Sequence, residues 1–398
     1  MGLAERETDR WRGQKRASVF YKPDRKIHMS NILLLKSEYD QSAWLDYLDR
    51  NLLVGGGLQE LIASGLRGVT SNPTIFHKAI TGSNDYDDTI RDLLQGDPEV
   101  EEEILYEWLA IQDIQRAADI LKPVYESSEG ADGFVCLEVS PHLAFDTSGT
   151  IDAARHLWRA VGRPNLMIKV PGTSHGIPAI ESLIAEGINV NVTLLFSVER
   201  YKEVVQAHIR GLEQNIHPED VASVASFFVS RVDTKVDALL DEAGSTDAQK
   251  LKGCIAIANA KMAYQHFRET LGSSDWETQH RRGARPQRPL WASTGTKNPE
   301  YSDVLYVEQL IGSQTVNTMT PDTLDAFQAH GELYTTLEMQ VDVARKQLEA
   351  LVGYGISLAR VTEELEQEGV DKFADSHDKL LAALKDKRFA VAEHFAEK

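Results

Sequence analysis

The sequence predicts an α/β protein, a (β/α)8 barrel of the TIM type with additional C-terminal helices. From about residue 30 onward, short runs rich in Val, Ile, Phe and Thr alternate with longer amphipathic stretches, as expected when crossover helices join parallel strands. Several of these runs are apolar throughout, which is typical of strands that helices cover from outside. Because eight such runs occur, a closed barrel is favoured over an open sheet.

The predicted elements follow one another without an internal repeat or a linker rich in Gly and Ser. The strands are Ala43–Asp46, Gly68–Ser71, Gly133–Val139, Leu166–Val170, Ile188–Leu194, Ser223–Val229, Leu290–Ser293 and Val316–Met319. Capping side chains or early prolines mark helix starts at Asn72-Pro73-Thr74, Thr173, Ser197 and Thr320-Pro321-Asp322. After residue 320 only helical patterns remain, at 341–351, 358–368 and 376–396, and we expect them to pack against the barrel.

The first 28 residues differ from the rest because they are strongly basic and show little apolar periodicity. Their cations are Arg6, Arg10, Arg12, Lys15, Arg16, Lys22, Arg25 and Lys26. We interpret 1–28 as a basic, disordered arm, such as a translation start upstream of Met29 would add; a nucleic-acid or targeting tail is the alternative. Residues 29–398 are predicted to form one barrel domain with a C-terminal helical extension.

Composition excludes several classes of partner. A net charge of −19 argues against nucleic acid and anionic membranes, since phosphate backbones require an excess of Lys and Arg. An anionic substrate therefore needs a local cationic pocket. Cys136 and Cys254 are the only cysteines, which excludes a disulfide framework and a four-cysteine metal site and predicts a cytoplasmic location. No apolar stretch is long enough to span a bilayer, and Ile32–Leu35 is too short for a signal-peptide core.

Lys169 stands at an unusual place for a charge, at the end of the apolar run Leu166–Ile168 and just before Val170-Pro171-Gly172. A lysine in apolar surroundings loses hydration and its pKa falls from about 10.4, which frees the amine to attack carbonyls. The chemistry indicated is Schiff-base formation. By itself, the run is also compatible with a lysine that ends a strand and reaches solvent.

Further polar residues fall at or near the ends of predicted strands, where barrel enzymes gather their chemistry. With Lys169 they form the set Asp46, Asn72, Glu138, Asn191, Thr193, Ser226, Arg231 and Ser293. Asn72 and Ser293 serve equally well as turn or cap residues, and Asp46 lies in an amphipathic run, 41–52, where an exposed acid is the simpler interpretation. Glu138 is an acid within a strand, so a structural role would need an ion-pair partner.

These residues sit in segments that together resemble the transaldolase family, in its longer bacterial type, over roughly residues 36–390. The segments, read in order, are Trp44-Leu45-Asp46, Gly68 to Phe76, Leu137 to Pro141, Met167 to Pro171, Asn189 to Ser197 and Ser226 to Arg231. Any one of them alone is a weak signal, whereas the ordered set is specific. The resemblance implies a metal-free and cofactor-free transfer of a dihydroxyacetone unit between sugar phosphates in the pentose phosphate pathway.

The resemblance also implies roles for individual residues. Lys169 matches the Schiff-base lysine, whose iminium is the electron sink. Asp46 matches the acid/base that takes the proton from the C4 hydroxyl of the donor and later returns it. Glu138 and Thr193 match the pair that holds a water for imine formation and hydrolysis. Asn72 and Asn191 match residues that hydrogen-bond the dihydroxyacetone unit.

The phosphate contacts are matched only in part. Ser226 and Arg231 match phosphate-binding positions, and a guanidinium with a hydroxyl suits a dianionic group. After the seventh strand, shorter transaldolases carry Ser-x-Arg, whereas this chain has Gly295 in place of the arginine that would follow Ser293. Lys297 supplies the charge in one interpretation and is a surface loop residue in the other.

Two further functions compete with transaldolase. A fructose-6-phosphate aldolase of the same superfamily resembles this chain at Lys169, but typically has glutamine in place of Glu138 and tyrosine in place of Phe228, so both positions favour transfer. The other is a barrel that binds sugar phosphate without catalysis. A dinucleotide cofactor is excluded, since Gly55-Gly56-Gly57 lacks the Gly-x-Gly-x-x-Gly spacing. The sequence does not indicate an oligomeric state.

Overall fold

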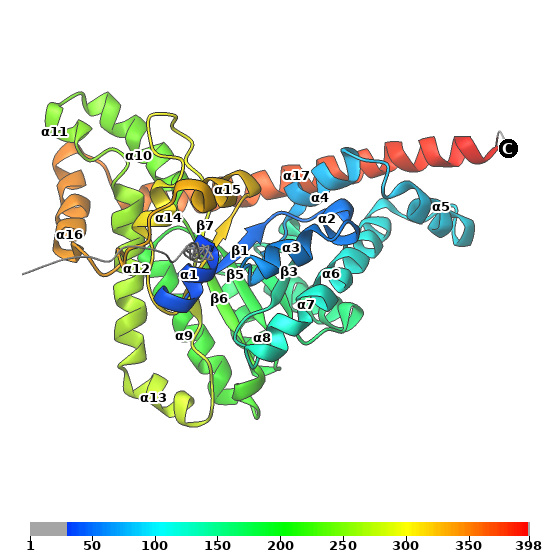
Figure 1. The fold of residues 1–398 in the computed structure, drawn as a ribbon, viewed down its shortest axis with the longest axis horizontal. Coiled ribbons are helices and arrows are strands. Elements are labelled where there is room, and N and C mark those ends of the chain that lie inside the picture. Colours follow the sequence, from blue (N-terminus) through cyan, green and yellow to red (C-terminus); the bar gives the residue numbers. More distant parts are fainter. Residues whose placement is uncertain (1–29, 397–398) are drawn as a thin grey trace, which may run out of the picture.

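The computed structural model describes residues 30–396, and its centre is a closed barrel of eight parallel strands (Figure 1). The strands are β1 (Gln41–Asp46), β2 (Gly68–Thr70), β3 (Phe134–Glu138), β4 (Leu166–Pro171), β5 (Val190–Leu195), β6 (Ser223–Phe228), β7 (Arg288–Ala292) and β8 (Thr315–Met319). Neighbours follow chain order and β8 closes on β1. The predicted fold class is confirmed, whereas the basic segment 1–28 lies outside the described residues.

Helices surround the barrel and connect its strands (Figure 1). They are α1 (Asn31–Tyr39), α2 (Arg50–Val54), α3 (Gly57–Ala63), α4 (Pro73–Thr81), α5 (Asp87–Gly96), α6 (Glu102–Ser127), η1 (Pro141–Leu143), α7 (Thr147–Val161), α8 (Gly176–Ala185), α9 (Val198–Gln214), η2 (Pro218–Asp220), α10 (Ser230–Ala243), α11 (Thr246–Gln249), α12 (Ile255–Leu271), α13 (Ser274–Arg281), α14 (Leu305–Gln309), α15 (Pro321–His330), α16 (Val341–Ala350), η3 (Leu351–Tyr354) and α17 (Leu358–Ala396). None of the helices in this part of the chain combines the length and apolarity needed to cross a bilayer.

The N-terminal end of the barrel is closed by packing and by a buried ion pair. Trp44 of β1 lies in register with Gly68 of β2, and a Cβ on Gly68 would come within 2.5 Å of the indole. Below the Trp44 indole, the buried Asp132 accepts hydrogen bonds from Ser42 and from Arg288 of β7. The bond from Arg288 is 3.0 Å long. Because these side chains close the barrel interior at this end, we expect a substrate to enter at the C-terminal ends of the strands.

Local cap chemistry sets two of the four predicted helix starts as expected. The Asn72 side chain accepts from the N–H of Ile75 at the start of α4, and Ser197 does the same for Arg200 in α9. At Thr173 the hydroxyl also accepts, as a cap does, from the N–H three residues later, although α8 itself begins at that residue, Gly176. α15 begins at Pro321, directly after Thr320, without a side-chain cap bond.

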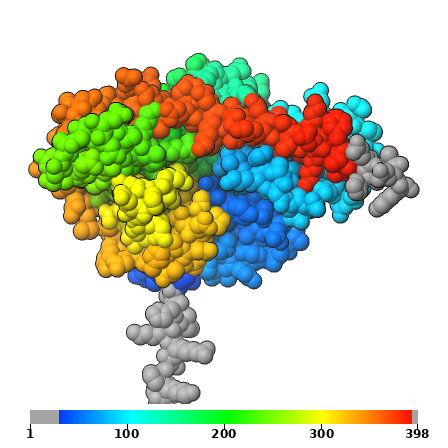
Figure 2. Space-filling model, turned by 90° about the horizontal axis from the view of Figure 1, so that it is seen from above, coloured from blue at the N-terminus to red at the C-terminus, as the bar shows by residue number. Residues whose placement is uncertain are grey.

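The C-terminal region differs from the prediction in continuity. Segments 358–368 and 376–396 belong to one helix, α17, because the residues between them continue its buried stripe with Val370 and Phe373. At Gly369 the missing side chain lets the helix approach β5, since a Cβ there would lie 2.9 Å from Leu194. Figure 2 looks down on α17 and shows it crossing the molecule, between the green segments that include α10 and the cyan segments that include α5.

Candidate active site

Three of the predicted residues lie side by side because of the strand register. Glu138 of β3 pairs with Lys169 of β4, which pairs with Asn191 of β5, so all three side chains point to the same inner face of the barrel. Lys169 is 5% exposed, and its ammonium donates to Oε2 of Glu138 at 3.0 Å and to the carbonyl of Ser71 at 3.1 Å. The apolar run thus delivers its lysine into the barrel, beside a carboxylate.

Burial and neighbouring charges act on the Glu138 carboxyl in opposite directions. Burial raises the pKa of the Glu138 carboxyl, an effect that Lys169 opposes and the negative charge of Asp46 reinforces. The Lys169 ammonium also lies 5.7 Å from the ring centroid of Phe373 on α17. A carboxyl of raised pKa in hydrogen-bond contact with an ammonium can accept its proton, which would leave a free amine under an aromatic cover.

Asp46 ends β1 on the same inner face. Its Oδ1 accepts from the hydroxyl of Thr70 at 2.7 Å, and Thr70 lies 3.0 Å from the hydroxyl of Thr318 on β8. Asp46 is in register with Thr70 on β2, which explains the contact. Its charge acts on both Glu138 and Arg231, so the structure brings Asp46 into the electrostatic environment of the lysine rather than to the surface.

The amide of Asn191 links two other side chains. It accepts from the hydroxyl of Ser226 at 2.7 Å and donates to the Cys136 sulfur at 3.3 Å. Ser226, which the sequence assigns to phosphate together with Arg231, thus holds the amide of Asn191. Thr193 lies two residues beyond Asn191 on β5, and its buried hydroxyl has no hydrogen-bond partner among residues 30–396. Within the same residues, the side-chain N–H groups of Asn72 make no hydrogen bond.

Cations gather on one side of the barrel mouth without acidic partners. Arg231 begins α10, and its guanidinium packs over the rings of Phe228 and Phe373. The charge of Arg231, partial burial and the charge of Lys297 together lower the pKa of Lys372 on α17. None of these three cations forms an ion pair with the acids in the described range. A converging set of unpaired cations favours a bound anion.

Ser293 closes this group from the end of β7. It adopts a left-handed backbone conformation (φ 57°), and its hydroxyl lies 3.0 Å from that of Ser230 at the start of α10. A non-glycine residue rarely adopts this conformation, and such strain is concentrated at functional sites.

Four residues at the site were missed from the sequence: Thr70, Thr318, Lys372 and Phe373. Thr70 stands at the predicted strand end beside Ser71 and could have been included by the same rule that found Asp46. The two residues on α17 carry no local signal, since Phe373 belongs to an ordinary apolar stripe and Lys372 to an ordinary charged face. Their part in the site depends on where the helix docks.

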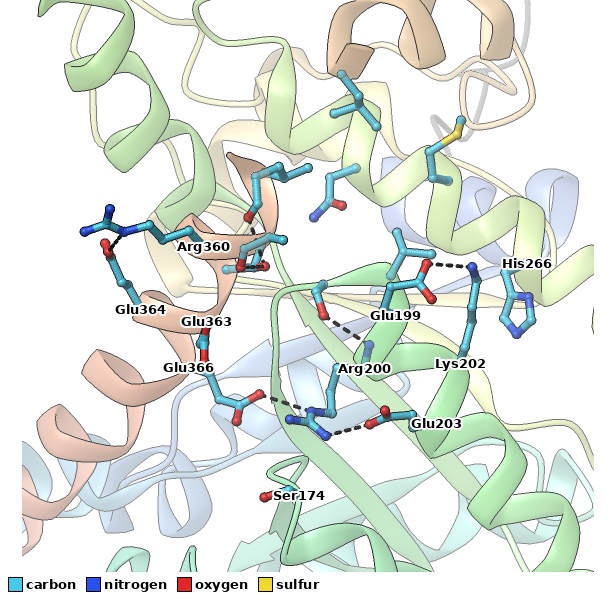
Figure 3. A pocket seen from close by; sticks show the side chains of 18 of the residues that line it. Ser174, Glu199, Arg200, Lys202, Glu203, His266, Arg360, Glu363, Glu364 and Glu366 are labelled. Atoms are coloured by element: carbon cyan, nitrogen blue, oxygen red, sulfur yellow. Dashed lines mark hydrogen bonds and ion pairs between the residues drawn. The ribbon is translucent and has the colours of Figure 1, made fainter. Parts of the chain in front are cut away.

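An open hollow of about 1180 Å³ lies beside the barrel, between α9, α12, α16 and the start of α17. Figure 3 shows that its charged side chains pair mostly with one another, as in the ion pairs of Arg200 with Glu203 and Glu366, and of Arg360 with Glu364. None of the residues lining this hollow in the described chain belongs to the predicted site. We therefore place the chemistry in the barrel mouth.

Within residues 30–396, three or more side chains that could bind a metal ion come together at one place, at the opposite end of the barrel from Lys169. There His217, Glu219 and Asp220, all exposed, precede β6. They lie at the closed N-terminal end, so they have no connection to the mouth.

Comparison with known proteins identifies a family whose members this chain resembles in sequence. Residues 43–384 match the model of a family described as Transaldolase/Fructose-6-phosphate aldolase. The chain is similar to the transaldolase of Thermobifida fusca (strain YX), with 48% identity over 359 residues, 89% of this chain and 97% of the relative. It is also similar to the transaldolases of Trichodesmium erythraeum (45%; 90% and 98% of the two chains) and Thiobacillus denitrificans (47%; 89% and 99%).

Proposed function

Because this chain belongs to the transaldolase/fructose-6-phosphate aldolase family, we propose that it is a transaldolase that works through a Schiff base on Lys169. The proposed reaction moves a dihydroxyacetone unit from a ketose phosphate, sedoheptulose 7-phosphate or fructose 6-phosphate, to an aldose phosphate, as in the pentose phosphate pathway. The observation that carries the proposal is the buried Lys169 ammonium, 3.0 Å from Glu138 inside the barrel mouth.

Imine formation begins with proton transfer from Lys169 to Glu138, which the raised pKa of the buried carboxyl supports. The free amine attacks the C2 carbonyl of the ketose to give a carbinolamine, and loss of water then leaves the iminium. The hydroxyl of Thr193 and Oε1 of Glu138 both lack partners in the described chain, which supports their role as holders of the water involved.

Carbon–carbon cleavage needs a base at the C4 hydroxyl of the donor, and we assign this role to Asp46. The hydrogen bond from Thr70 orients its carboxylate. When the C3–C4 bond breaks, its electron pair moves to the iminium and the proton moves to Asp46; the acceptor aldehyde later takes both back. We place Asn191, held by Ser226, and Asn72, with its free amide N–H groups, along the dihydroxyacetone unit.

The phosphate end of the substrate is assigned to the cations at the mouth. Arg231 and Ser293 supply a guanidinium and a hydroxyl, and Lys297 and Lys372 add charge from two further elements. Lys372 thereby stands in for the arginine that Gly295 replaces. The two cysteines form no disulfide, which supports a reducing compartment, and we propose the cytoplasm.

The test is reductive trapping with borohydride in the presence of fructose 6-phosphate, followed by peptide mapping. We expect one adduct, on the peptide that contains Lys169, and its loss in Lys169→Ala. Lys261 of α12 is the matched control, because it is also 5% exposed but donates to the carbonyl of Met339, outside the mouth. An adduct that persists in Lys169→Ala, or disappears in Lys261→Ala, contradicts the assignment.

A second assay separates transfer from simple aldol cleavage. With fructose 6-phosphate as donor and erythrose 4-phosphate as acceptor, a transaldolase forms sedoheptulose 7-phosphate. Release of free dihydroxyacetone without that product would identify a fructose-6-phosphate aldolase instead.

A further inference from the structure

A second cavity lies next to β3 and has Glu138 among its lining residues. Its volume is about 210 Å³, and it is enclosed by β3, η1, α6, α7 and α17. Much of its wall is apolar, but it also includes Glu138, Tyr106, His377, Glu103 and Glu107. We call this space the rear cavity. It is large enough for several water molecules, and its polar groups meet the requirement of buried water for hydrogen-bond partners.

Two residues in the lining of this cavity each carry a buried polar atom that lacks a partner in the described chain. Oε2 of Glu138 is bound to Lys169, but Oε1 accepts no hydrogen bond. His377 is 2% exposed, and its Nε2 lies 3.2 Å from Glu103, whereas its Nδ1 is buried and unpaired. Leaving such groups without a partner costs about 1–3 kcal/mol each, which water in the cavity would recover. Because a carboxylate oxygen accepts two hydrogen bonds, Oε1 can bind a rear water as well as the water at Thr193.

Tyr106 connects these two groups along α6. Burial, and then the negative charges of Glu138 and Glu103, raise the pKa of its hydroxyl, which therefore stays protonated and passes a proton on only by accepting another. Its ring packs edge-on against that of His377, at 5.5 Å. Glu103, Tyr106 and Glu107 follow the i, i+3, i+4 spacing of one helix face.

The rear cavity ends in solvent. The Glu103 side chain is largely exposed, and Glu107 forms an exposed ion pair with His156 of α7 at 2.6 Å. The charged and titratable groups around His377 are Glu103 and Tyr106 from α6, His142 from η1 and its own neighbour Asp378. The lining of the rear cavity thus extends from Glu138 to charged groups at the molecular surface.

We propose that ordered water in the rear cavity joins Glu138 to His377, and that the catalytic carboxylate exchanges protons with solvent along this route. The proposal rests on the proposed function, in which Glu138 takes a proton from Lys169 and returns it during imine formation. A proton released by Glu138 passes through water to Nδ1 of His377, while the proton on Nε2 leaves to Glu103 and solvent. His377 is thus a positioning residue, and the route stays open while substrate and Phe373 cover the front of Glu138.

His377→Gln tests the route, because glutamine keeps a donor for Glu103 but does not titrate. His142→Gln is the matched control: His142 packs on His377 at 5.8 Å, but it is exposed, pairs with Asp378 and does not line the cavity. The readout is the rate of Lys169 adduct formation with fructose 6-phosphate, quenched with borohydride at timed intervals across pH. A group that acts directly as a general acid or base contributes about 100-fold or more to a rate. Because His377 acts indirectly, we expect its loss to slow adduct formation by about tenfold.

Two further signatures separate proton exchange from a structural effect. In the unchanged protein, we expect the rate of adduct formation to change with pH as His377 titrates, and we expect His377→Gln to lose that pH dependence. Added imidazole should restore the rate in His377→Gly. Tyr106→Phe, which keeps the ring but removes the hydroxyl, should slow the rate in the same direction and replaces His377→Gln if that variant does not fold. Adduct formation that matches His142→Gln in rate and pH profile, or a slower rate with an unchanged profile and no rescue, overturns the proposal. An unchanged protein that forms no Lys169 adduct refutes the proposed function itself.

Discussion

Lys372→Met offers the sharpest test of how the mouth recognises phosphate, because the change removes one charge and keeps most of the side-chain stem. Lys372 is exposed and makes no ion pair with the described acids, so we expect the free energy of unfolding to stay within about 0.5 kcal/mol of its original value. The substitution therefore reports on the substrate rather than on folding.

The magnitude follows from the position of the charge. Two unit charges about 4 Å apart interact by about 1 kcal/mol in water and about 4 kcal/mol at a partly buried site. Exposed Lys372 belongs near the lower value, so the loss is about 1–2 kcal/mol, or roughly a 5- to 30-fold rise in KM for phosphorylated substrates. Half-buried Arg231 should give a larger effect when changed to methionine, because a charge-assisted hydrogen bond to a bound phosphate would contribute about 1.5–3 kcal/mol.

The assay compares KM for erythrose 4-phosphate with KM for unphosphorylated erythrose as acceptor. Lys379→Met is the control, since Lys379 lies two turns further along α17 and pairs with Asp375 on the surface. We expect Lys372→Met to raise KM for the phosphorylated acceptor alone. Equal changes for both acceptors, or the same effect from Lys379→Met, would refute the phosphate assignment.

Three other predictions follow from the buried groups. Glu138→Gln should slow Lys169 adduct formation by about 100- to 10,000-fold at an unchanged final yield, measured by timed borohydride quenching; an unchanged rate would exclude the proton relay. Asp233, which accepts from the N–H of Ala256 and the hydroxyl of Tyr306, has a pKa raised by burial to about 7, so the folded state holds its proton more tightly than the unfolded state and stability falls as pH rises from about 4 to 7. Urea unfolding should show this fall, of about 4 kcal/mol at most, in the unchanged protein, and a smaller one in Asp233→Asn; parallel curves would contradict the assignment. Phe373→Ala should cost about 3–5 kcal/mol of stability and speed hydrolysis of the unreduced Schiff-base intermediate, whereas Phe373→Leu should restore most of both because it keeps apolar bulk over the amine; equal effects of the two would argue against a cover by apolar bulk.

The barrel and the lysine were predictable because both depend on short-range pattern. Apolar runs such as Leu166–Ile168 form strands whatever surrounds them, and alternation then directs Lys169 inward when Ile168 packs outward. The rule that polar residues at strand ends meet in one mouth found Asp46, Glu138 and Asn191 without any knowledge of their distances. The continuity of α17 was missed because the segments at 358–368 and 376–396 stand out by their charge and leucines, while the buried Val370 and Phe373 between them do not.

The sequence by itself therefore determined the eight strands and their parallel order, since both follow from local periodicity and chain order, whereas the roles proposed for the site residues rest on the resemblance to a family. Only the tertiary structure decided that Phe373 lies over Lys169, that Lys372 lies close to Arg231, and that Ser226 donates to Asn191. The physical reason is that these contacts join elements distant in the chain. Their geometry depends on strand register and on how closely α17 can dock at Gly369, and no local pattern encodes either.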